Sequence, residues 1–145
     1  MSDSLVNNGV NIIGLKKNNI NYMMTCAWVN QVGYDELTIL IGSQSETGKQ
    51  IEVCSLIGVS SLTKSSKDLA SFIGNNHSSE VNKFSNQCYL NKDAILIKEA
   101  RVNMLCQVID ILHLKGIEED SLIYVKVIDK KFNSNEKFLS MDEMR

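Results

Sequence analysis

The sequence predicts a mostly β fold, a closed or partly closed antiparallel barrel with one or two accessory helices. Stretches rich in Val, Ile and Leu recur along the 145 residues, and short polar turns connect most of them. One segment has clear helical spacing, so helices are expected to be few. Because the chain contains no proline, Gly and Asn must mark its turns.

Three strands are predicted in the first third of the chain. Residues 8–15, "NGVNIIGL", form the first, and the Asn-rich stretch 16–21 forms the turn after it, since Asn tolerates left-handed backbone. Residues 22–32, "YMMTCAWVNQV", form a second strand that breaks midway. Residues 36–42 form a third, rich in β-branched side chains.

A polar turn over residues 43–48, "SQSETG", is predicted to open a short helix. Ser45 or Thr47 is a suitable N-cap, and the helix is expected to extend over 50–54. A strand follows at 56–62, "LIGVSSL".

The clearest helix is predicted over residues 64–74. Leu69, Phe72 and Ile73 share one face, and Gly74 is a typical helix end. Residues 78–84, "SSEVNKF", are expected to add one more helical turn.

Extended structure is predicted for much of the remaining chain. Residues 93–114 form a long, loosely alternating stretch whose best part is 100–112, and residues 118–129 form the last strand. We expect a single domain over residues 1–131 and a polar C-terminal tail over 132–145 that is mobile or docks on a partner.

Composition excludes several functional classes. Hydrophobic residues make up 43% and charged residues 22% of the chain, which is typical of a globular domain. The net charge of −2, without a basic block, argues against nucleic-acid binding. No apolar run reaches the roughly 18 residues of a membrane span, and no signal peptide is visible, so a cytoplasmic location is expected.

The four cysteines are widely separated and form no C-x-x-C motif. This spacing argues against zinc, iron–sulfur and thioredoxin-type sites, and two histidines add no convincing metal site. We expect reduced structural thiols, with Cys26 as the exception because of the segment in which it lies.

The segment "GSQSETGKQI", residues 42–51, partly resembles a phosphate-binding P-loop. Its glycines enclose five residues where the Walker pattern has four, and Gln50 stands where Ser or Thr should bind magnesium. Two interpretations stay open, a solvated turn or a turn that holds a phosphate monoester without hydrolysing it. The candidate donors for the second are Ser43, Gln44, Ser45 and Thr47.

His77 is the candidate catalytic residue, because it lies in a predicted loop beside Ser78 and Ser79. A Ser-His-Asp hydrolase is not supported, since no nucleophile elbow is present. The open alternatives are a functional imidazole and a solvated loop residue.

The stretch "NYMMTCAWVNQVG", residues 21–33, carries no charge over thirteen residues and contains the only Trp of the chain. It reads either as a core strand or as a contact surface for a flat, uncharged group.

Five motifs in register resemble the flavin reductase-like, FMN-binding split-barrel family. They are "YMMTCAWVNQV", "SETGKQI", "FIG" at a helix end, "SSEVNKF", and the pair "MLCQV" and "EEDSLIYVKV", and the resemblance spans residues about 9 to 131. It implies a Greek-key antiparallel split β-barrel, a homodimer, and FMN as the cofactor.

The resemblance also implies where the flavin lies. The ring would contact Thr25, Cys26, Ala27 and Trp28, with Asn30 and Gln31 just beyond. The phosphate would bind at Ser43, Gln44, Ser45 and Thr47, and the loop that closes over the cofactor would supply Ser78, Ser79 and Lys83. His77 would then lie near the N1–O2 edge of the ring or near the phosphates of a nicotinamide.

Two functional classes follow. The first is an oxidoreductase, either an NAD(P)H-dependent flavin reductase or a flavoredoxin-like protein that relays electrons from a redox partner through FMN. Since the sequence has no G-x-G-x-x-G motif, NAD(P)H would bind in a groove over the flavin. The second is a non-catalytic, dimeric split-barrel binding module.

Overall fold

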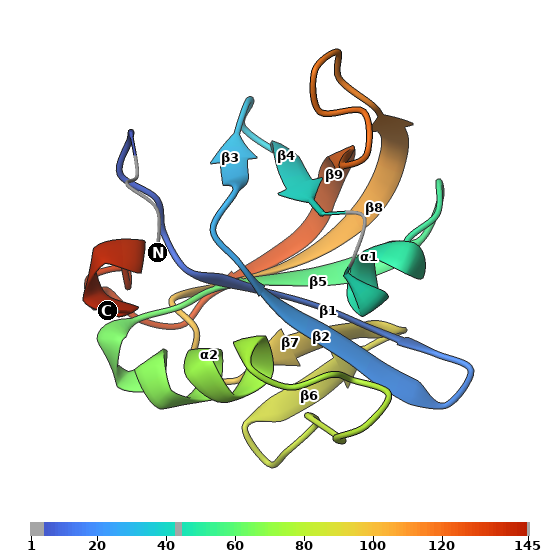
Figure 1. The fold of residues 1–145 in the computed structure, drawn as a ribbon. Helices are drawn as coiled ribbons and strands as arrows, with labels where there is room; N and C mark the ends of the chain where they lie inside the picture. Colours follow the sequence, from blue (N-terminus) through green and yellow to red (C-terminus); the bar gives the residue numbers. More distant parts are fainter. Residues whose placement is uncertain (1–4, 43–44, 145) are drawn as a thin grey trace.

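The computed structural model describes residues 5–42 and 45–144, which fold around one large antiparallel sheet (Figure 1). The elements in chain order are β1 (Asn11–Lys17), β2 (Ile20–Cys26), β3 (Val29–Gln31), β4 (Glu36–Ile41), α1 (Glu46–Lys49), β5 (Leu56–Ser61), a 3-10 turn (Lys64–Ser66), α2 (Lys67–Gly74), β6 (Cys88–Asn91), β7 (Ala94–Ile97), β8 (Val102–Leu112), β9 (Ser121–Phe132) and a second 3-10 turn (Met141–Met144).

The sheet curls into a split barrel around β1. Its strands run in the order β3-β4-β9-β8-β5-β1-β7-β6, and β2 also pairs with β1. The first half of β1 pairs with β5, whereas Leu15 near its end pairs with Ala94 of β7. Every pairing is antiparallel, so the predicted fold class, a mostly β split barrel with accessory helices, is confirmed.

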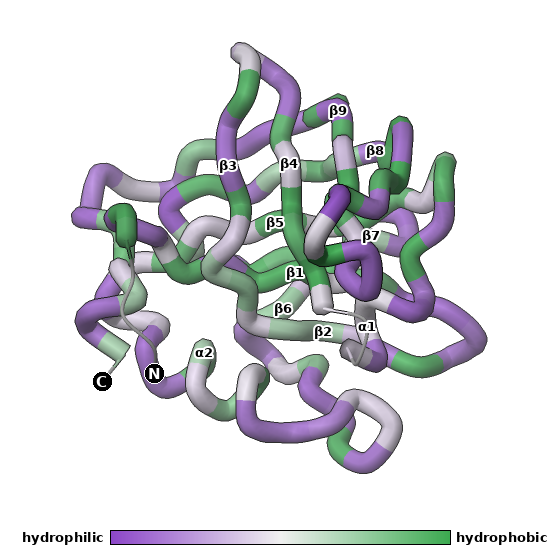
Figure 2. The backbone as a smooth tube through the Cα atoms, turned by 45° about the horizontal axis from the view of Figure 1, so that its top comes forward, coloured by the Kyte–Doolittle hydropathy of each residue, from purple (hydrophilic) through white to green (hydrophobic). Residues whose placement is uncertain are grey.

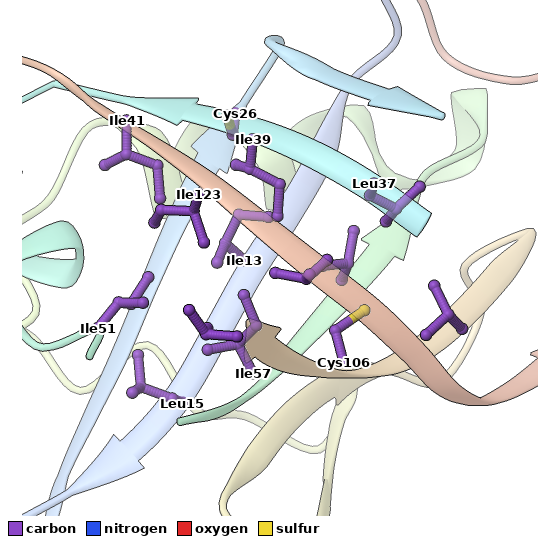
Figure 3. Packing of buried hydrophobic residues seen from close by; sticks show 14 of the residues in the cluster. Ile13, Leu15, Cys26, Leu37, Ile39, Ile41, Ile51, Ile57, Cys106 and Ile123 are labelled. Carbon is purple, nitrogen blue, oxygen red and sulfur yellow. The ribbon is translucent and has the colours of Figure 1, made fainter. Parts of the chain in front are cut away.

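The barrel interior is filled mainly by aliphatic side chains, together with two thiols and Tyr22. In Figure 3, Ile13, Ile39, Ile57 and Ile123 converge from four different strands, and Cys106 lies beside them. Hydrophobic residues dominate the tube of β1 and β4, whereas the loops are mostly hydrophilic (Figure 2). These strands alternate inward and outward as the β period requires.

A second core lies on the opposite face of β1. Ile12 points there, one residue before the barrel-facing Ile13, because successive strand residues face opposite sides. Ile73 of α2 and Ile95 of β7 pack against it. Both faces of β1 are therefore buried, and α2 lies alongside the β1–β2 hairpin (Figure 1).

Two glycines allow β7 to approach β1 and β5 closely. A Cβ at Gly58 would lie 2.1 Å from the carbonyl oxygen of Ile95, and a Cβ at Gly14 would lie 2.8 Å from the Ile95 Cβ. Larger residues at these positions would force β7 away from the barrel.

Two predicted elements were wrong in detail, and one strand was not predicted. The long stretch over 93–114 is two strands, because the chain turns at 98–101 between β7 and β8. The strand β6 was missed. The helix at α1 ends at Lys49 instead of extending over 50–54, where Cys54 has a φ of 76°.

The helical turn expected over 78–84 is present at the start of this segment, where the His77 carbonyl oxygen accepts hydrogen bonds from the amides of Glu80 and Val81. Residues 82–84 are irregular.

The C-terminal segment packs on its own chain, in contrast to the mobile or partner-bound tail that was expected. Leu139 is buried in the second core, and its amide donates to the carbonyl oxygen of Leu62 at 2.8 Å. The guanidinium of Arg101 lies 4.2 Å from the centre of the Phe138 ring. The N- and C-terminal segments lie side by side, and the Met141 amide donates to the Asn8 carbonyl oxygen (Figure 1).

Within the described ranges, none of the helices has the length and apolar composition needed to cross a membrane.

Candidate functional site

The strand break predicted in the second strand lies at Ala27 and Trp28, between β2 and β3. These two residues leave the regular ladder, although the Trp28 carbonyl oxygen still accepts from the Leu40 amide at 2.9 Å. The Trp28 side chain is 54% exposed. The break therefore presents peptide groups and an aromatic ring at the surface instead of in the core.

A large cavity of about 720 Å³ lies against this break. Its lining is mostly apolar and comes from β2, β3, β4, the loop before β9 and both ends of the described chain. The lining residues are Leu5, Val6, Asn8, Met24, Thr25, Cys26, Ala27, Trp28, Asn30, Leu40, Gly42, Leu114, Leu122 and Met141.

A small cavity of about 250 Å³ adjoins the large one, and the two share Met24 and Thr25. It lies between β2, α1 and the loop after α2, and its lining is more polar. The residues are Met23, Met24, Thr25, Ser45, Glu46, Thr47, Ile73, Gly74, Asn75, Asn76, His77, Ser78 and Lys83.

The loop after α2 is fastened to β2 through the backbone of Met23. The Met23 amide donates to Ser78 Oγ at 3.1 Å, and Lys83 Nζ donates to the Met23 carbonyl oxygen at 2.8 Å. Lys83 is only 3% exposed. Burial lowers the pKa of its ammonium, and attraction to the Glu46 carboxylate opposes that shift.

Glu46, the first residue of α1, carries a negative charge into the small cavity. Its carboxylate accepts hydrogen bonds from the hydroxyl and the backbone amide of Ser79, and its Oε1 lies 3.6 Å from His77 Nδ1. The Ser79 hydroxyl holds the pKa of this carboxyl below its usual value against the effect of desolvation. Glu46 is therefore an anion at neutral pH.

The predicted phosphate turn is partly described. Ser43 and Gln44 lie outside the described residues. Ser45 is the N-cap of α1: its Oγ accepts from the Gly48 amide at 3.1 Å and lies 3.3 Å from Met24 Sδ. Thr47 is buried and lines the small cavity.

Cys26 turns its side chain into the barrel core, away from the large cavity that its residue lines (Figure 3). Its thiol lies 3.7 Å from the Leu40 carbonyl oxygen, and burial raises its pKa to about 11. Its own carbonyl oxygen accepts from Asn11 Nδ2 at 3.2 Å. Cys26 therefore offers the site no reactive thiol.

Asn30 and Gln31 were both predicted to lie near the flavin ring, but because side chains alternate along β3, they face opposite sides of the strand. Asn30 lines the large cavity with Trp28, whereas Gln31 lines a third cavity of about 280 Å³ on the other side of the strand. Val29 and Tyr34 line that third cavity as well.

His77 lies at the rim of the small cavity, with its side chain 71% exposed. The residues of the strand break line the large cavity, and Thr25 is common to both. The structure thus gathers Ser45, Thr47, His77, Ser78 and Lys83 at one end, and Thr25 to Trp28 with Asn30 at the other.

Sequence reasoning missed several lining residues. Glu46 was visible within "SETG", but the sequence gives no sign that its carboxylate faces the cavity. Leu114 and Met141 come from distant segments and carry no local signal. Within the described part of the chain, no cluster of three or more His, Cys, Asp or Glu side chains could hold a metal ion.

A family model described as the flavin reductase like domain matches residues 3–143. The chain belongs to this family. The resemblance drawn from the sequence motifs is therefore confirmed, and the match extends beyond residue 131 into the C-terminal segment.

Solved flavin reductase-like structures share the fold at low sequence identity. The NADH:FAD oxidoreductase SgcE6 of Streptomyces globisporus C-1027 has a TM-score of 0.84 at 16% identity, with 97% of this chain and 84% of that chain covered. Flavoredoxin from Methanosarcina acetivorans has a TM-score of 0.76 at 17% identity, with 92% of this chain and 75% of that chain covered. An FMN-binding protein from Thermus thermophilus has a TM-score of 0.80 at 13% identity, with 90% of this chain and 75% of that chain covered.

No curated protein matches this flavin reductase-like chain in sequence. The family model therefore places the chain in a flavin-binding family.

Proposed function

We propose that this flavin reductase-like domain binds FMN and passes electrons through it from NAD(P)H or from a redox protein. The observation that carries the proposal is the junction of the two cavities at Met24 and Thr25. A long ligand with a flat apolar end and a polar end could occupy both at once.

The large cavity suits a flavin ring. Its volume lies in the range of small-molecule sites, roughly 300–1,000 Å³. The residues around the strand break are uncharged, Trp28 offers an aromatic face, and Ala27 lies outside the regular strands. Peptide groups there could hydrogen-bond to the heteroatoms at a ring edge, while apolar surface covers its faces.

The small cavity suits the polar side chain of a flavin. Thr47, Asn75, Asn76 and Lys83 lie on its wall, and the Lys83 ammonium donates to the Met23 carbonyl oxygen. Ser43 and Gln44 are proposed as further phosphate donors on the resemblance alone. Among the described residues that line this cavity, the Glu46 carboxylate opposes a phosphate.

Bound flavin would supply the redox chemistry by accepting a hydride and releasing electrons, so this chain needs no acid–base pair for the step. The protein's own tasks are to hold the ring against residues 25–28 and to leave one ring face open to the donor. We assign His77 to the donor side, where its exposed imidazole could meet the phosphates of a nicotinamide.

An anaerobic absorbance titration tests this function. Purified protein loaded with FMN should retain a flavin spectrum after gel filtration and should bleach on addition of NADH or NADPH. Bleaching only with dithionite would favour the flavoredoxin-like relay over the reductase. Failure to bind any flavin would favour the non-catalytic binding module.

We also propose a homodimer. Exposed apolar side chains gather around the third cavity, among them Tyr34, Phe132 and Phe138. A second copy of the chain would cover such a surface. Light scattering at micromolar concentration should give twice the chain mass, and a monomeric mass would reject the dimer.

A further inference from the structure

Glu46 brings a carboxylate to the wall of the small cavity. It takes the hydroxyl and the amide of Ser79 as donors, and it faces His77 at 3.6 Å. His77 lines the cavity with Glu46, so a phosphate that approached the imidazole would also meet the carboxylate. An entering phosphate must therefore displace the carboxylate or accept it as a neighbour.

The charges of the cavity are balanced before any ligand arrives. The buried ammonium of Lys83 donates to the Met23 carbonyl oxygen at 2.8 Å, and the Glu46 carboxylate is the charge that interacts with it. A doubly charged phosphate would leave this region with an excess of negative charge, and like charges at close range oppose binding.

A hydroxyl-terminated chain meets no such repulsion. Alcohol groups donate hydrogen bonds to carboxylates, and bonds to a charged acceptor are stronger than those between neutral groups. A polyol end would therefore complement Glu46, whereas a phosphate end competes with it.

We propose that Glu46 is a specificity-determining residue that disfavours FMN relative to riboflavin, the same flavin without its phosphate. This deepens the proposed flavin-binding function and rests on it. Under this proposal FMN is held mainly through its ring, and its phosphate adds nothing to the affinity.

The test compares Glu46→Gln with the unchanged protein. Glutamine keeps an acceptor for the Ser79 hydroxyl but removes the charge. Glu80→Gln, in the exposed turn after His77, is the matched control because it changes net charge equally outside the cavity lining. Dissociation constants for FMN and riboflavin are measured by quenching of flavin fluorescence, and melting temperatures check folding.

We expect the unchanged protein to bind riboflavin at least as tightly as FMN. Glu46→Gln should shift the affinity ratio toward FMN by about tenfold or more, while Glu80→Gln shifts it by less than about twofold. A ratio that moves no further in Glu46→Gln than in Glu80→Gln would overturn the proposal and leave flavin binding intact.

Inorganic phosphate gives a readout that needs no flavin. In amide NMR titrations, the Ser79 and Asn76 signals of Glu46→Gln should respond to phosphate at a concentration about fivefold lower than in the unchanged protein. If that shift occurs while neither flavin binds, the role of Glu46 stands and the flavin function falls. If the phosphate response is the same in both proteins, Glu46 does not control the cavity.

Discussion

The hydroxyl of Thr25 donates to the carbonyl oxygen of Ala70 at 2.7 Å, so this hydrogen bond links the C-terminal end of β2 to α2. Thr25 is also one of the two residues that both cavities share. The side chain that sequence reasoning assigned to a cofactor is thus already engaged within the protein. Thr25 itself remains part of the wall where the two cavities meet.

Removing this hydroxyl should loosen α2. We expect Thr25→Val, which keeps the shape but loses the donor, to lower the free energy of unfolding by about 1 kcal/mol. Chemical denaturation measures the loss. Thr25→Ser retains the hydroxyl and serves as control, and an equal loss in both variants would assign the effect to packing.

Bulk at Ala27 should close the large cavity. Because the Cys26 side chain lies in the barrel core, a large residue there would overpack the barrel, whereas Ala27 lies at the strand break. We expect Ala27→Trp to fold and to lose flavin, as judged by absorbance after gel filtration. Gln31→Trp, on the other side of β3, should keep it. If Ala27→Trp retained flavin, the ring would have to bind outside the large cavity.

Trp28 is the only tryptophan of the chain and lines the large cavity, so its fluorescence reports on that cavity alone. Flavin binding should quench this emission in step with occupancy. We expect Trp28→Phe to keep most of the affinity and Trp28→Ala to lose about 1–2 kcal/mol of binding free energy, measured by flavin fluorescence. Saturating flavin without any quenching would contradict the placement.

Loss of the His77 imidazole should slow flavin reduction by NAD(P)H. A tenfold lower rate in His77→Ala corresponds to about 1.4 kcal/mol of lost transition-state stabilisation. FMN affinity should change far less, and reduction by dithionite should proceed as before. Stopped-flow absorbance measures all three, and equal rates in both proteins would make His77 a solvated loop residue.

The cysteines should differ sharply in reactivity. Burial raises the pKa of the Cys26 thiol to about 11 and that of Cys106 to about 12, and Cys88 is buried too, whereas Cys54 is exposed. At pH 8 we expect iodoacetamide to modify Cys54 alone in the folded protein, as measured by mass spectrometry, and all four cysteines in denaturant. Rapid labelling of Cys26 in the folded state would contradict its placement in the core.

The raised pKa values of Cys26 and Cys106 also predict how the stability of the fold depends on pH. The folded pKa values of Cys26 and Cys106 lie above their usual value of 9.0, so the unfolded chain loses these protons first as pH rises. Their contribution to stability is complete below about pH 9 and declines as the pH rises toward 11 and 12.

Most of the fold follows from local patterns, and the exceptions have physical causes. The strands β4 and β5 and the helix α2 show clear periodicity, and Gly74 marks the helix end as expected. The turn between β7 and β8 was missed because residues 98–101 contain neither Gly nor Asn. The strand β6 is only four residues long, too short for an alternating pattern to be recognised.

The site was predictable where it is continuous in sequence. The break at Ala27 and Trp28 and the loop at His77 and Ser78 could be found from motifs. The separation of Gln31 from Asn30 could not, because it depends on which way β3 resumes after the break. The inward direction of Glu46 depends on its contact with Ser79, thirty-three residues away.

The strand β3 separates the large cavity from the third cavity, and its successive side chains face one and then the other. It has three residues, lies at the end of the sheet and pairs only with β4. A slip of one residue in this register would bring Val29 and Gln31 to the side of the large cavity and turn Asn30 away. The length of the loop at 32–35 therefore decides which β3 side chains each cavity receives, and a single-residue deletion there would exchange them without altering any residue of β3.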